Sequence, residues 1–531
     1  MRSLFFILLF LSFSSILIAQ KPDTLWTKTY GGSQTECYGY GMDAQVRIDV
    51  NNINQIFITT STTSTDYDIH TSYGSVDCFV VKTNGNGDTL WTKVVGGNDY
   101  DIPRDIIALD DGGCLVAGWT YSNSDLMIGH HGDTMSEDGF IFRLDSLGNI
   151  VWLKQYGGSD FIGIPGRDKI FDIIKMQNGN FLALGQTNSN NGDLYMDLSM
   201  FYVGWVLEID GNGNVQTSKK LCWTTHDENN PDYFEEGLQL SDGSGFLCFG
   251  ESIHGLSSSK FWVMKLDNSF DEVWQYEYGC SSFNFPSSIT EAENNGAVFT
   301  GWIQSGGGDV SGSYLGGSLD AWVAKIDSSG SLVNNKTVGG SEAEIPSRII
   351  SLDSKLAFYF SGSTRSIDYY GGGDTTTAMD FWLIKFDQNL DSIWTYKPGG
   401  TQSDAATDIA LSTQGNRLFV VGKSESSDLY VNNNYGSRDV WLCSLQDFHV
   451  GITESKKLDN ITIYPNPCKN YFKINKNIET LKLYNVLGSL VFSAKNINKN
   501  TAVDIPNLSP SLYFVELISE GECFITRLII N

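Results

Sequence analysis

One segment type occurs seven times along this 531-residue chain and constrains its fold more than any other feature. Each copy has an aromatic residue, often preceded by Asp, followed by alternating apolar residues and an acidic turn. The seven aromatic residues are Phe79, Phe140, Trp205, Trp262, Trp322, Trp382 and Trp441. Their spacings are 61, 65, 57, 60, 60 and 59 residues, and such regularity identifies a repeat architecture rather than a local motif.

A second segment series lies about a dozen residues after six of these aromatic residues, and it begins once before any of them. Its typical form is LWTKVVGG at 90–97, with related copies at 25–32, 151–158, 273–280, 333–340 and 393–400. A degenerate copy, VQTSKKL, occupies 215–221. The second series therefore also has seven copies, displaced by one place toward the N-terminus.

Each repeat also carries two strand-like runs between the two series. An example is RDIIALDDGGCLVAGWT at 104–120, in which a DGG turn separates alternating apolar stretches. Four short strands in roughly 60 residues are typical of one propeller blade, whereas parallel solenoids have shorter periods. We therefore predict an all-β chain in which residues 21–448 form a seven-bladed β-propeller.

The displacement of the second series predicts that the N-terminal strand closes the ring. If the aromatic strand is third in each blade and the WxK-GG strand is fourth, the last blade lacks a fourth strand. The spare copy at 25–32 can supply it and so remove the exposed edge of an open ring. We expect the middle strands to be buried on both faces, because blades pack face to face.

Charge limits the classes of partner. The chain has 35 basic and 62 acidic side chains, for a net charge of -27. Such a surface repels phosphate, so neither nucleic acid nor an anionic membrane is an expected partner. The negative charge is concentrated in residues 21–458, which carry -29, whereas residues 459–531 carry +1.

The first 20 residues, MRSLFFILLFLSFSSILIAQ, contain one Arg, an apolar run and Ala19 before the polar KPDT. This order is typical of a secretory signal peptide. Ser12, Ser14 and Ser15 interrupt the apolar run, and no later segment reaches the length of a membrane-spanning helix. We predict that residues 1–20 are a signal peptide and that no transmembrane segment remains after its cleavage.

The repeat resembles a known family. The sequence DAWVAKIDSSGSLVNNKTVGGSEAE, which begins at 320, and the later FSGSTRS are similar to the secreted bacterial β-propeller repeat family abbreviated SBBP. The resemblance covers some 425 residues and implies a secreted or surface-displayed propeller. The fourth blade departs most from the pattern, since it lacks the paired glycines after VQTSKKL and the Asp before Trp262.

The blade repeats stop near residue 450, and a linker at 449–458 leads to a module at 459–531. Its strand-like runs, separated by Asn and Gly turns, predict a small C-terminal β-sandwich. The module resembles the type A C-terminal sorting domain of type IX secretion substrates. The residues that carry the resemblance are Tyr464, Pro465, Asn466, Pro467, Gly488 and Tyr513, with the final LIIN.

The sorting-domain resemblance implies handling by the type IX secretion machinery and export across the outer membrane of a Gram-negative bacterium. It also implies that this module is removed and that the protein is attached to the cell surface or released. We therefore expect a secreted or cell-surface location. Cys468 and Cys523 both fall in this module, where an intradomain disulfide remains open.

Common catalytic sequence motifs are absent from the chain. The chain has no GxSxG, no HExxH and no CxxC, and its nine cysteines are scattered. We therefore expect no catalytic site, no zinc site and no disulfide framework, and we expect most cysteines to be small buried apolar residues.

An Asp recurs 12 to 15 residues before the aromatic residue in six repeats, in the loop after the second strand: Asp66, Asp125, Asp193, Asp309, Asp368 and Asp428. As hard oxygen ligands, these residues are calcium candidates, provided that backbone and amide oxygens complete the shell. The alternative is that each Asp closes its own turn. No other cofactor is expected.

Aromatic residues in these loops, among them Tyr67, Tyr314, Tyr369, Tyr370 and Tyr435, suit either stacking on sugar rings or covering of the blade ends. The favoured function is an exported β-propeller that acts as a binding module for an extracellular protein or glycan. The alternative is an extracellular polysaccharide hydrolase or lyase, which would need a carboxylate pair in a pocket.

Overall fold

The computed structural model describes residues 21–38, 45–132, 135–159, 165–193, 202–223, 231–255, 258–310, 319–352, 355–368, 378–413, 417–431, 433–447, 461–484, 490–505, 508–509, 511–519 and 522–530. The chain divides into two compact units, Lys21–Asp447 and a C-terminal unit within Phe448–Asn531. The predicted signal peptide and the linker at 449–458 lie outside the described residues. None of the helices found in those ranges has the length and apolar character needed to cross a membrane.

The N-terminal unit consists of seven four-stranded antiparallel sheets. The first four sheets follow one another along the chain. Their strands are β2 (Arg47–Val50), β3 (Ile56–Thr62), β4 (Asp77–Thr83) and β5 (Thr89–Val95); β6 (Asp101–Ala108), β7 (Cys114–Thr120), β8 (Asp138–Leu144) and β9 (Ile150–Tyr156); β10 (Lys169–Lys175), β11 (Phe181–Thr187), β12 (Val203–Ile209) and β13 (Val215–Leu221); and β14 (Asp232–Gln239), β15 (Phe246–His254), β16 (Ser258–Leu266) and β17 (Glu272–Tyr278).

The last three sheets keep the same order. Their strands are β18 (Asn284–Glu291), β19 (Ala297–Ile303), β20 (Asp320–Ile326) and β21 (Leu332–Val338); β22 (Glu344–Ser351), β23 (Ala357–Thr364), β24 (Asp380–Asp387) and β25 (Ser392–Tyr396); and β26 (Asp404–Leu411), β27 (Arg417–Ser424) and β28 (Asp439–Gln446), joined by β1 (Asp23–Tyr30). A short 3-10 helix, η2 (Glu293–Asn295), lies between β18 and β19.

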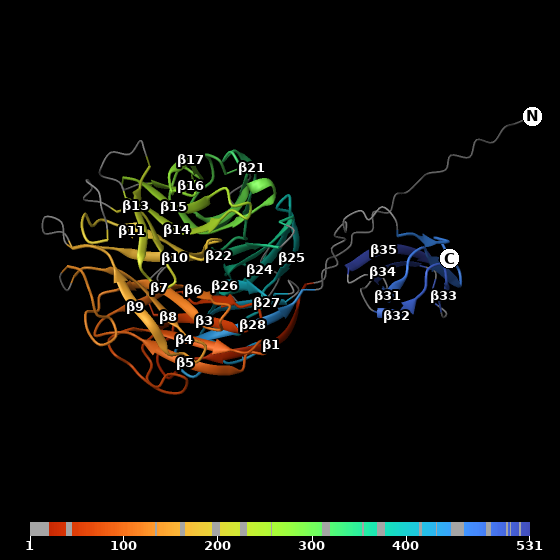
Figure 1. Ribbon diagram of the computed structural model, residues 1–531, viewed down its shortest axis with the longest axis horizontal. Helices are drawn as coiled ribbons and strands as arrows, with labels where there is room; N and C mark the ends of the chain where they lie inside the picture. Colours follow the sequence, from red (N-terminus) through yellow and green to blue (C-terminus); the bar gives the residue numbers. More distant parts are fainter. Residues whose placement is uncertain are drawn as a thin grey trace, which may run out of the picture. The chain divides into compact units, whose positions relative to one another are not determined.

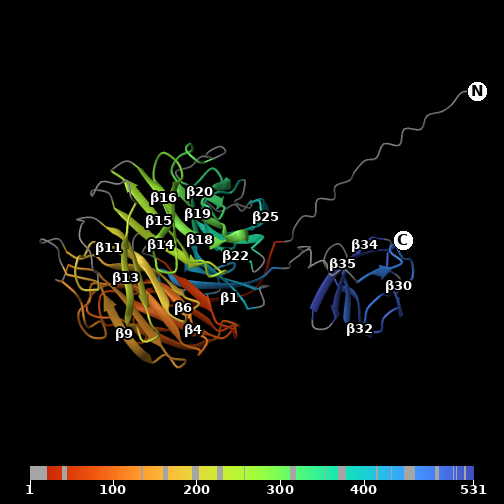
Figure 2. The ribbon, with the colours of Figure 1, turned by 45° about the horizontal axis from the view of Figure 1, so that its top comes forward.

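The sheets surround a common centre, as in a β-propeller. Figure 1 shows the first strands β6, β10, β14, β22 and β26 toward the middle and the fourth strands β5, β9, β13, β17, β21 and β25 at the periphery. In Figure 2, the inner strand β18 lies between β14 and β22, with which it makes contact. The seven predicted repeats thus correspond to seven sheets, with the aromatic strand third in each and the WxK-GG strand fourth.

Strand β1 occupies the fourth position of the last sheet. It pairs antiparallel with β28 from Asp23 opposite Gln446 to Tyr30 opposite Val440. The last sheet also packs against the first. The Val46 amide, just before β2, donates to Thr407 Oγ1 of β26 at 3.2 Å, and residues of both sheets belong to one apolar cluster. The two ends of the repeat array therefore meet.

Local sequence explains the regular bends of the inner strands. Six of the seven carry a β-bulge, and in β6, β18 and β22 the residue before the bulge is Pro103, Pro286 or Pro346. Proline has no N–H to contribute to the ladder, so it is tolerated where pairing is interrupted. The bulge turns the following side chains toward the neighbouring sheet.

Turns between third and fourth strands begin with a carboxylate or amide side chain. Asp145 Oδ1 accepts hydrogen bonds from the amides of Leu147 (2.8 Å) and Asn149 (2.9 Å). Gly148 completes this turn with φ +83°, a conformation that favours glycine. The fourth and sixth sheets have the same turn with Phe270 (φ +58°) and Leu390 (φ +61°) at the position of the glycine.

The core lies between neighbouring sheets. The five tryptophans of the third strands are fully buried: Trp205, Trp262, Trp322, Trp382 and Trp441. In the fifth sheet, all seven residues of β20 are buried, which confirms the prediction that middle strands are covered on both faces.

The C-terminal unit contains two sheets that share one apolar cluster, which confirms the predicted small β-sandwich. The first sheet has the order β29 (Ile463–Tyr464), β30 (Tyr471–Ile474) and β33 (Ala502–Asp504). The second has the order β32 (Leu490–Ile497), β31 (Ile478–Tyr484), β34 (Ser511–Ser519) and β35 (Glu522–Ile530). Cys468 is a buried free thiol.

Candidate functional site

The inner strands place one residue from each sheet at the same level of the central channel. In sheets two to seven this residue pairs with the one just before the glycine of the second strand, and Arg47 pairs with Thr59 at the same position of the first sheet. We call this set the channel ring: Arg47, Asp105, Asp172, Glu236, Ser288, Arg348 and Asp408.

The channel ring joins neighbouring sheets through hydrogen bonds. Five ring side chains each accept a hydrogen bond from a backbone amide of the next sheet. The donor is the residue directly after the ring residue of that sheet. The pairs are Asp105 with Ile173 (3.1 Å), Asp172 with Gly237 (2.8 Å), Glu236 with Ile289 (3.3 Å), Ser288 with Ile349 (3.1 Å) and Asp408 with Ile48 (3.0 Å). Buried amides need such acceptors, so the ring stabilises the contacts between sheets.

The two arginines of the ring cannot accept a hydrogen bond, and the surrounding residues compensate. Between the first and second sheets, Asp49 Oδ2 accepts the Ala108 amide at 2.8 Å instead. Arg348 Nη1 lies 2.8 Å from Glu236 Oε1, and its Nε lies 3.4 Å from Asp408 Oδ1. Arg348 therefore reaches past the small Ser288 to bind a carboxylate two sheets away.

With Asp49, the channel holds five carboxylates against two guanidinium groups. Burial raises the pKa of Asp49 to about 7 and that of Asp172 to about 6. Burial also raises the pKa of Glu236 to about 7, although Arg348 and Arg47 act in the opposite direction. A buried, uncompensated charge is costly, so these groups take up protons near neutral pH.

A cavity of about 370 Å³ opens below the ring, at the end where the inner strands finish. Its charged and polar lining comes from Asp49, Asp105, Asp172, Lys175, Gln239 and Arg348, and most of the remainder is aliphatic. The three aspartates each accept an amide bond between sheets, so the lining is first of all structural.

A second cavity, of about 190 Å³, lies at the opposite end, where the inner strands begin. Trp302, Pro346 and Met379 supply apolar surface, and Ser287, Ser347 and Thr407 supply hydroxyl groups. These hydroxyls donate to the carbonyls of Pro346 (2.9 Å), Ala406 (2.8 Å) and Val46 (2.7 Å). The hydroxyl oxygens of Ser287 and Ser347 keep acceptor capacity toward the cavity.

Partly exposed aromatic side chains surround this end of the channel. Trp302 stacks on Phe285 with ring centroids 3.6 Å apart. On the other side, Tyr38, Tyr100, Tyr121 and Tyr233 cover a cluster formed by Val76, Ile102, Trp119 and Phe171. We call the six partly exposed residues, Tyr38, Tyr100, Tyr121, Tyr233, Phe285 and Trp302, the mouth aromatics.

Charged groups beside the mouth aromatics are paired. Arg104 and Glu235 form a buried ion pair, and the Arg104 guanidinium lies 4.8 Å from the ring centroid of Phe171. Tyr121 Oη donates to Glu137 at 2.5 Å. The end of the channel therefore presents aromatic rings with oriented polar groups between them, an arrangement that suits polyhydroxylated ligands.

The six calcium candidates lie in the loops between second and third strands, as expected, and five of them bind backbone amides. Asp66 accepts the Ser33 amide (2.7 Å), Asp193 that of Gly157 (3.3 Å), Asp309 that of Gly279 (3.0 Å), Asp368 that of Ser341 (3.0 Å) and Asp428 that of Thr401 (2.9 Å). Asp125 accepts a bond from Ser124 Oγ (2.8 Å). The first five aspartates therefore tie their loops to the glycine loop that precedes the sheet.

The structure does not bring the calcium candidates together. They come from six sheets, and across the ranges listed above no three His, Cys, Asp or Glu side chains are grouped as a metal site. Among the loop tyrosines, Tyr67 and Tyr435 have ring centroids 5.0 Å apart. Tyr314, Tyr369 and Tyr370 lie outside the described residues.

The sorting-motif residues connect the two ends of the C-terminal unit. Asn466 Oδ1 accepts the Ile529 amide at 2.9 Å, and the Cys468 amide donates to the Ile529 carbonyl at 2.8 Å. Tyr464 Oη donates to Asn500 Oδ1 (2.8 Å), and Tyr513 Oη donates to the Ser509 carbonyl (2.8 Å). Gly488 lies outside the described residues.

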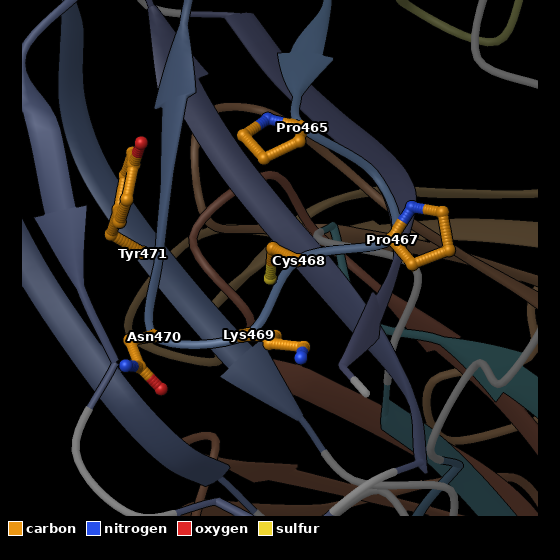
Figure 3. A pocket seen from close by; sticks show the side chains of 6 residues that line it. All are labelled: Pro465, Pro467, Cys468, Lys469, Asn470 and Tyr471. Carbon is orange, nitrogen blue, oxygen red and sulfur yellow. The ribbon is translucent and has the colours of Figure 1, made fainter.

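The same motif forms a pocket of about 300 Å³, lined by Pro465, Pro467, Cys468, Lys469, Asn470 and Tyr471. Figure 3 shows the two proline rings and Tyr471 around Cys468. The motif thus has a structural part, Asn466, and an apolar surface formed by its prolines.

Residues 462–531 match the family described as the secretion system C-terminal sorting domain. The chain therefore carries a type IX sorting domain and is a secreted or cell-surface protein of a Gram-negative bacterium of the Bacteroidetes type.

One curated relative is the regulatory protein FlaEY of Caulobacter vibrioides, which is 30% identical over 125 residues. That match includes 22% of this chain, and the chain spans 13% of the length of that relative.

Solved structures with a similar fold include Chaetomium thermophilum Raptor, with 7% identity, a TM-score of 0.45, and coverage of 80% of this chain and 29% of that one. Kuenenia stuttgartiensis hydrazine synthase has 10% identity and a TM-score of 0.37, with coverage of 81% and 96%. The periplasmic gluconolactonase PpgL of Pseudomonas aeruginosa has 11% identity and a TM-score of 0.34, with coverage of 74% and 99%.

Sequence reasoning missed the channel ring and the mouth aromatics. The ring residues differ in type from sheet to sheet, so no repeated letter marks them. The one signal was positional: each follows a short run at the start of the first strand and occurs once per repeat, as in DIPRD at 101–105 and EIPSR at 344–348.

Proposed function

We propose that this exported β-propeller is a binding module that holds a glycan at the end of the channel where the inner strands begin. The observation that carries the proposal is the cavity of about 190 Å³ that Trp302 lines together with serine and threonine hydroxyls. Drug-sized pockets occupy roughly 300–1,000 Å³. The smaller volume here suits one sugar unit, whose ring can stack on Trp302.

The mouth aromatics extend the site for a longer chain. Tyr100, Tyr121 and Tyr233 are partly exposed around the same end of the channel, and the hydroxyls of Tyr121 and Tyr233 donate to Glu137 and Glu251, which fixes the orientation of these two rings. Aromatic side chains give large contact area at low entropic cost, because few torsions are frozen. The net charge of -29 on residues 21–458 favours neutral or cationic glycans over anionic ones.

A glycan array with the full mature chain, followed by calorimetric titration of the best ligand, tests the proposal. Trp302→Ala should weaken binding by about tenfold or more, which corresponds to about 1.4 kcal/mol. Trp91→Ala provides the matched control, since Trp91 lies on the outer strand β5. Equal affinity of the wild type and Trp302→Ala for the ligand would show that the ligand does not bind in this cavity. A glycan array on which the chain binds no glycan would contradict a glycan ligand.

A second candidate function, an extracellular polysaccharide hydrolase or lyase, is supported by the carboxylates of the cavity of about 370 Å³ at the end where the inner strands finish. Asp105 and Asp172 are buried neighbours, and the presence of Asp172 adds to the effect of burial in raising the pKa of Asp105. A protonated and an ionised carboxyl are the groups that glycoside hydrolysis requires. Release of reducing ends from a polymer by wild type, but not by Asp172→Asn, would favour this function.

A further inference from the structure

Pairs of buried carboxyl groups recur where one sheet meets the next. One member is the first residue of a third strand, and the other follows the paired glycines, at or before the start of the next inner strand. Five such junctions contain two acids: Asp439 with Glu36, Asp77 with Asp101, Asp138 with Asp168, Asp320 with Glu344, and Asp380 with Asp404. All ten side chains are at most 2% exposed.

The second member of each pair holds the paired-glycine loop. Asp101 Oδ2 accepts the Gly97 amide (2.6 Å) and Ser122 Oγ (3.0 Å), and its Oδ1 accepts Thr120 Oγ1. Asp168, Glu344 and Asp404 make the same bonds to Gly158, Gly340 and Gly400. Glu36 accepts the Gly32 amide at 3.1 Å. These oxygens are therefore already occupied by donors.

In three junctions the first member combines one open oxygen with a second oxygen that accepts a backbone amide. Asp77 Oδ1, Asp138 Oδ1 and Asp439 Oδ1 are buried without a hydrogen-bond donor, whereas the Oδ2 atom of each accepts a backbone amide. An unsatisfied buried carboxylate oxygen is costly, so each of these three atoms calls for a positively charged or hydrogen-bonding partner.

Each open oxygen borders the same glycine as the other carboxyl of its pair. The space that a Cβ on Gly96 would take is in contact with Asp77 Oδ1 and lies 3.1 Å from Asp101 Oδ2. The equivalent position on Gly157 lies 2.8 Å from Asp138 Oδ1 and 2.7 Å from Asp168 Oδ2. Asp439 Oδ1 and Glu36 Oε2 flank Gly31 in the same way. Only glycine leaves room for the two carboxyls.

We propose that the junctions of Asp77 with Asp101 and of Asp439 with Glu36 are proton-binding sites, in which one proton on the open oxygen is donated to the facing carboxylate. The junction of Asp138 is different, because Asp138 Oδ2 lies 3.0 Å from His131 Nδ1 and 3.4 Å from His130 Nδ1, and a protonated imidazole there supplies positive charge instead. A divalent cation does not suit the geometry. Calcium takes about six to eight oxygen ligands, whereas at the first junction three of the four carboxyl oxygens already accept N–H or O–H donors. One proton satisfies the remaining oxygen and removes one of two buried like charges.

The chain contains a version of the same junction without acids. Between the fourth and fifth sheets, Lys260 and Asn284 replace the two acids. Asn284 Oδ1 accepts the Cys280 amide at 2.8 Å, as Asp101 accepts that of Gly97, and Lys260 Nζ donates to the Cys280 carbonyl at 2.5 Å. An amide side chain therefore fits the position of the second acid, and the first position is filled by a cation.

The direction of the pH effect follows from the pair Asp77 and Asp101. Burial raises the pKa of both carboxyls, that of Asp101 to about 7. The groups that face the pair are Asp125 and the thiol of Cys78, and neither is a cation. The folded chain holds the proton more tightly than the unfolded chain. The stabilisation of the fold by this proton is therefore complete below about pH 4 and is lost as the pH rises through about 7.

Thermal unfolding of the full mature chain at pH 5 and pH 8 tests the proposal with two matched variants. Asp77→Asn supplies a permanent N–H donor, so its melting temperature should exceed that of wild type at pH 8 and match it at pH 5. Asp380→Asn is the control, because Asp380 Oδ2 lies 3.2 Å from buried Lys397 Nζ and loss of this ion pair should lower the melting temperature at pH 8. The wild-type profile alone does not suffice, since Asp172 and Glu236 titrate over the same range.

A lower melting temperature for Asp77→Asn than for wild type at pH 8 would overturn the proposal. If that variant does not fold, infrared spectroscopy of the wild type supplies a second test. A protonated-carboxyl band should be present at pH 6 and decline by pH 9 in the folded chain. Because Asp172 and Glu236 contribute to the same band, the band at pH 6 should be weaker in Asp439→Asn than in the wild type, and equal bands would also overturn the proposal. A calcium-induced rise in the wild-type melting temperature at pH 8 that Asp77→Asn abolishes would assign the site to a metal instead.

Discussion

Asn466 Oδ1 accepts the Ile529 amide at 2.9 Å and so links the segment after β29 to the last strand of the sorting domain, β35. Asn466→Ala should remove this bond, lower the stability of the domain by about 1 kcal/mol, and reduce the amount of protein at the cell surface. Lys499→Ala is a suitable control because Lys499 is exposed. Surface labelling of cells that express each variant measures the effect, and unchanged export of Asn466→Ala would show that this link is dispensable for recognition.

Trp382 is fully buried between the sixth sheet and its neighbour. Trp382→Ala should destabilise the propeller by about 3–5 kcal/mol, through lost burial and a residual cavity. The exposed Val333, at 60% exposure, offers a control in which Val333→Ala changes stability little. Denaturant titration measures both. A small loss for Trp382→Ala would mean that the sheets are less tightly packed than the structure shows.

Arg348 binds Glu236 and Asp408 inside the channel. Arg348→Met should destabilise the chain by about 3–5 kcal/mol at pH 8, because it leaves buried carboxylates without their cation. Arg348 lowers the pKa of Glu236, which burial raises to about 7, so the substitution raises that pKa further. Since the folded state then binds the proton more tightly, the loss should shrink as the pH falls from 8 to 5. Unfolding measured at both pH values checks this, and a pH-independent loss would contradict it.

The loop aspartates bind backbone amides rather than converge, as Asp428 does with the amide and hydroxyl of Thr401 (2.9 and 2.7 Å). We expect the melting temperature to be the same with calcium and with a chelator. Asp428→Ala should cost about 1 kcal/mol through loss of the loop contact. A calcium-dependent rise that Asp428→Ala removes would reinstate these residues as ligands.

Much of the fold could be predicted from the sequence because each blade repeats its own pattern. The aromatic strand with Trp322 and the WxK-GG strand recur at nearly constant spacing, and period-2 alternation fixes which residues face the neighbouring sheets. The displaced copy at 25–32 indicated where β1 would pair. The sorting motif was recognisable from Tyr464 to Pro467, because these residues are adjacent in the chain.

The channel and the junctions could not be predicted in the same way. A bulge shifts the facing of six inner strands by one residue, so the direction of Asp105 or Arg348 depends on a backbone irregularity that composition does not mark. Asp77 and Asp101 are 24 residues apart and meet only when two sheets pack. A usable signal does exist: in several repeats an acid lies four residues after the second glycine, as Asp404 does after Gly400.

The pairing of β1 with β28 is the contact on which the ring, the junction of Glu36 with Asp439 and the channel all depend, and a single cysteine tests it. Thr27 lies directly opposite the buried free thiol of Cys443. Paired Cα atoms of about 4.5–5.5 Å separation are within disulfide range. Under mild oxidation, Thr27→Cys should form an intramolecular 27–443 disulfide, identified by peptide mass spectrometry, and raise the melting temperature. Thr29→Cys, which faces Trp441, should not. A folded Thr27→Cys variant that forms no such bond, or forms it only between two chains, would contradict closure by the N-terminal strand.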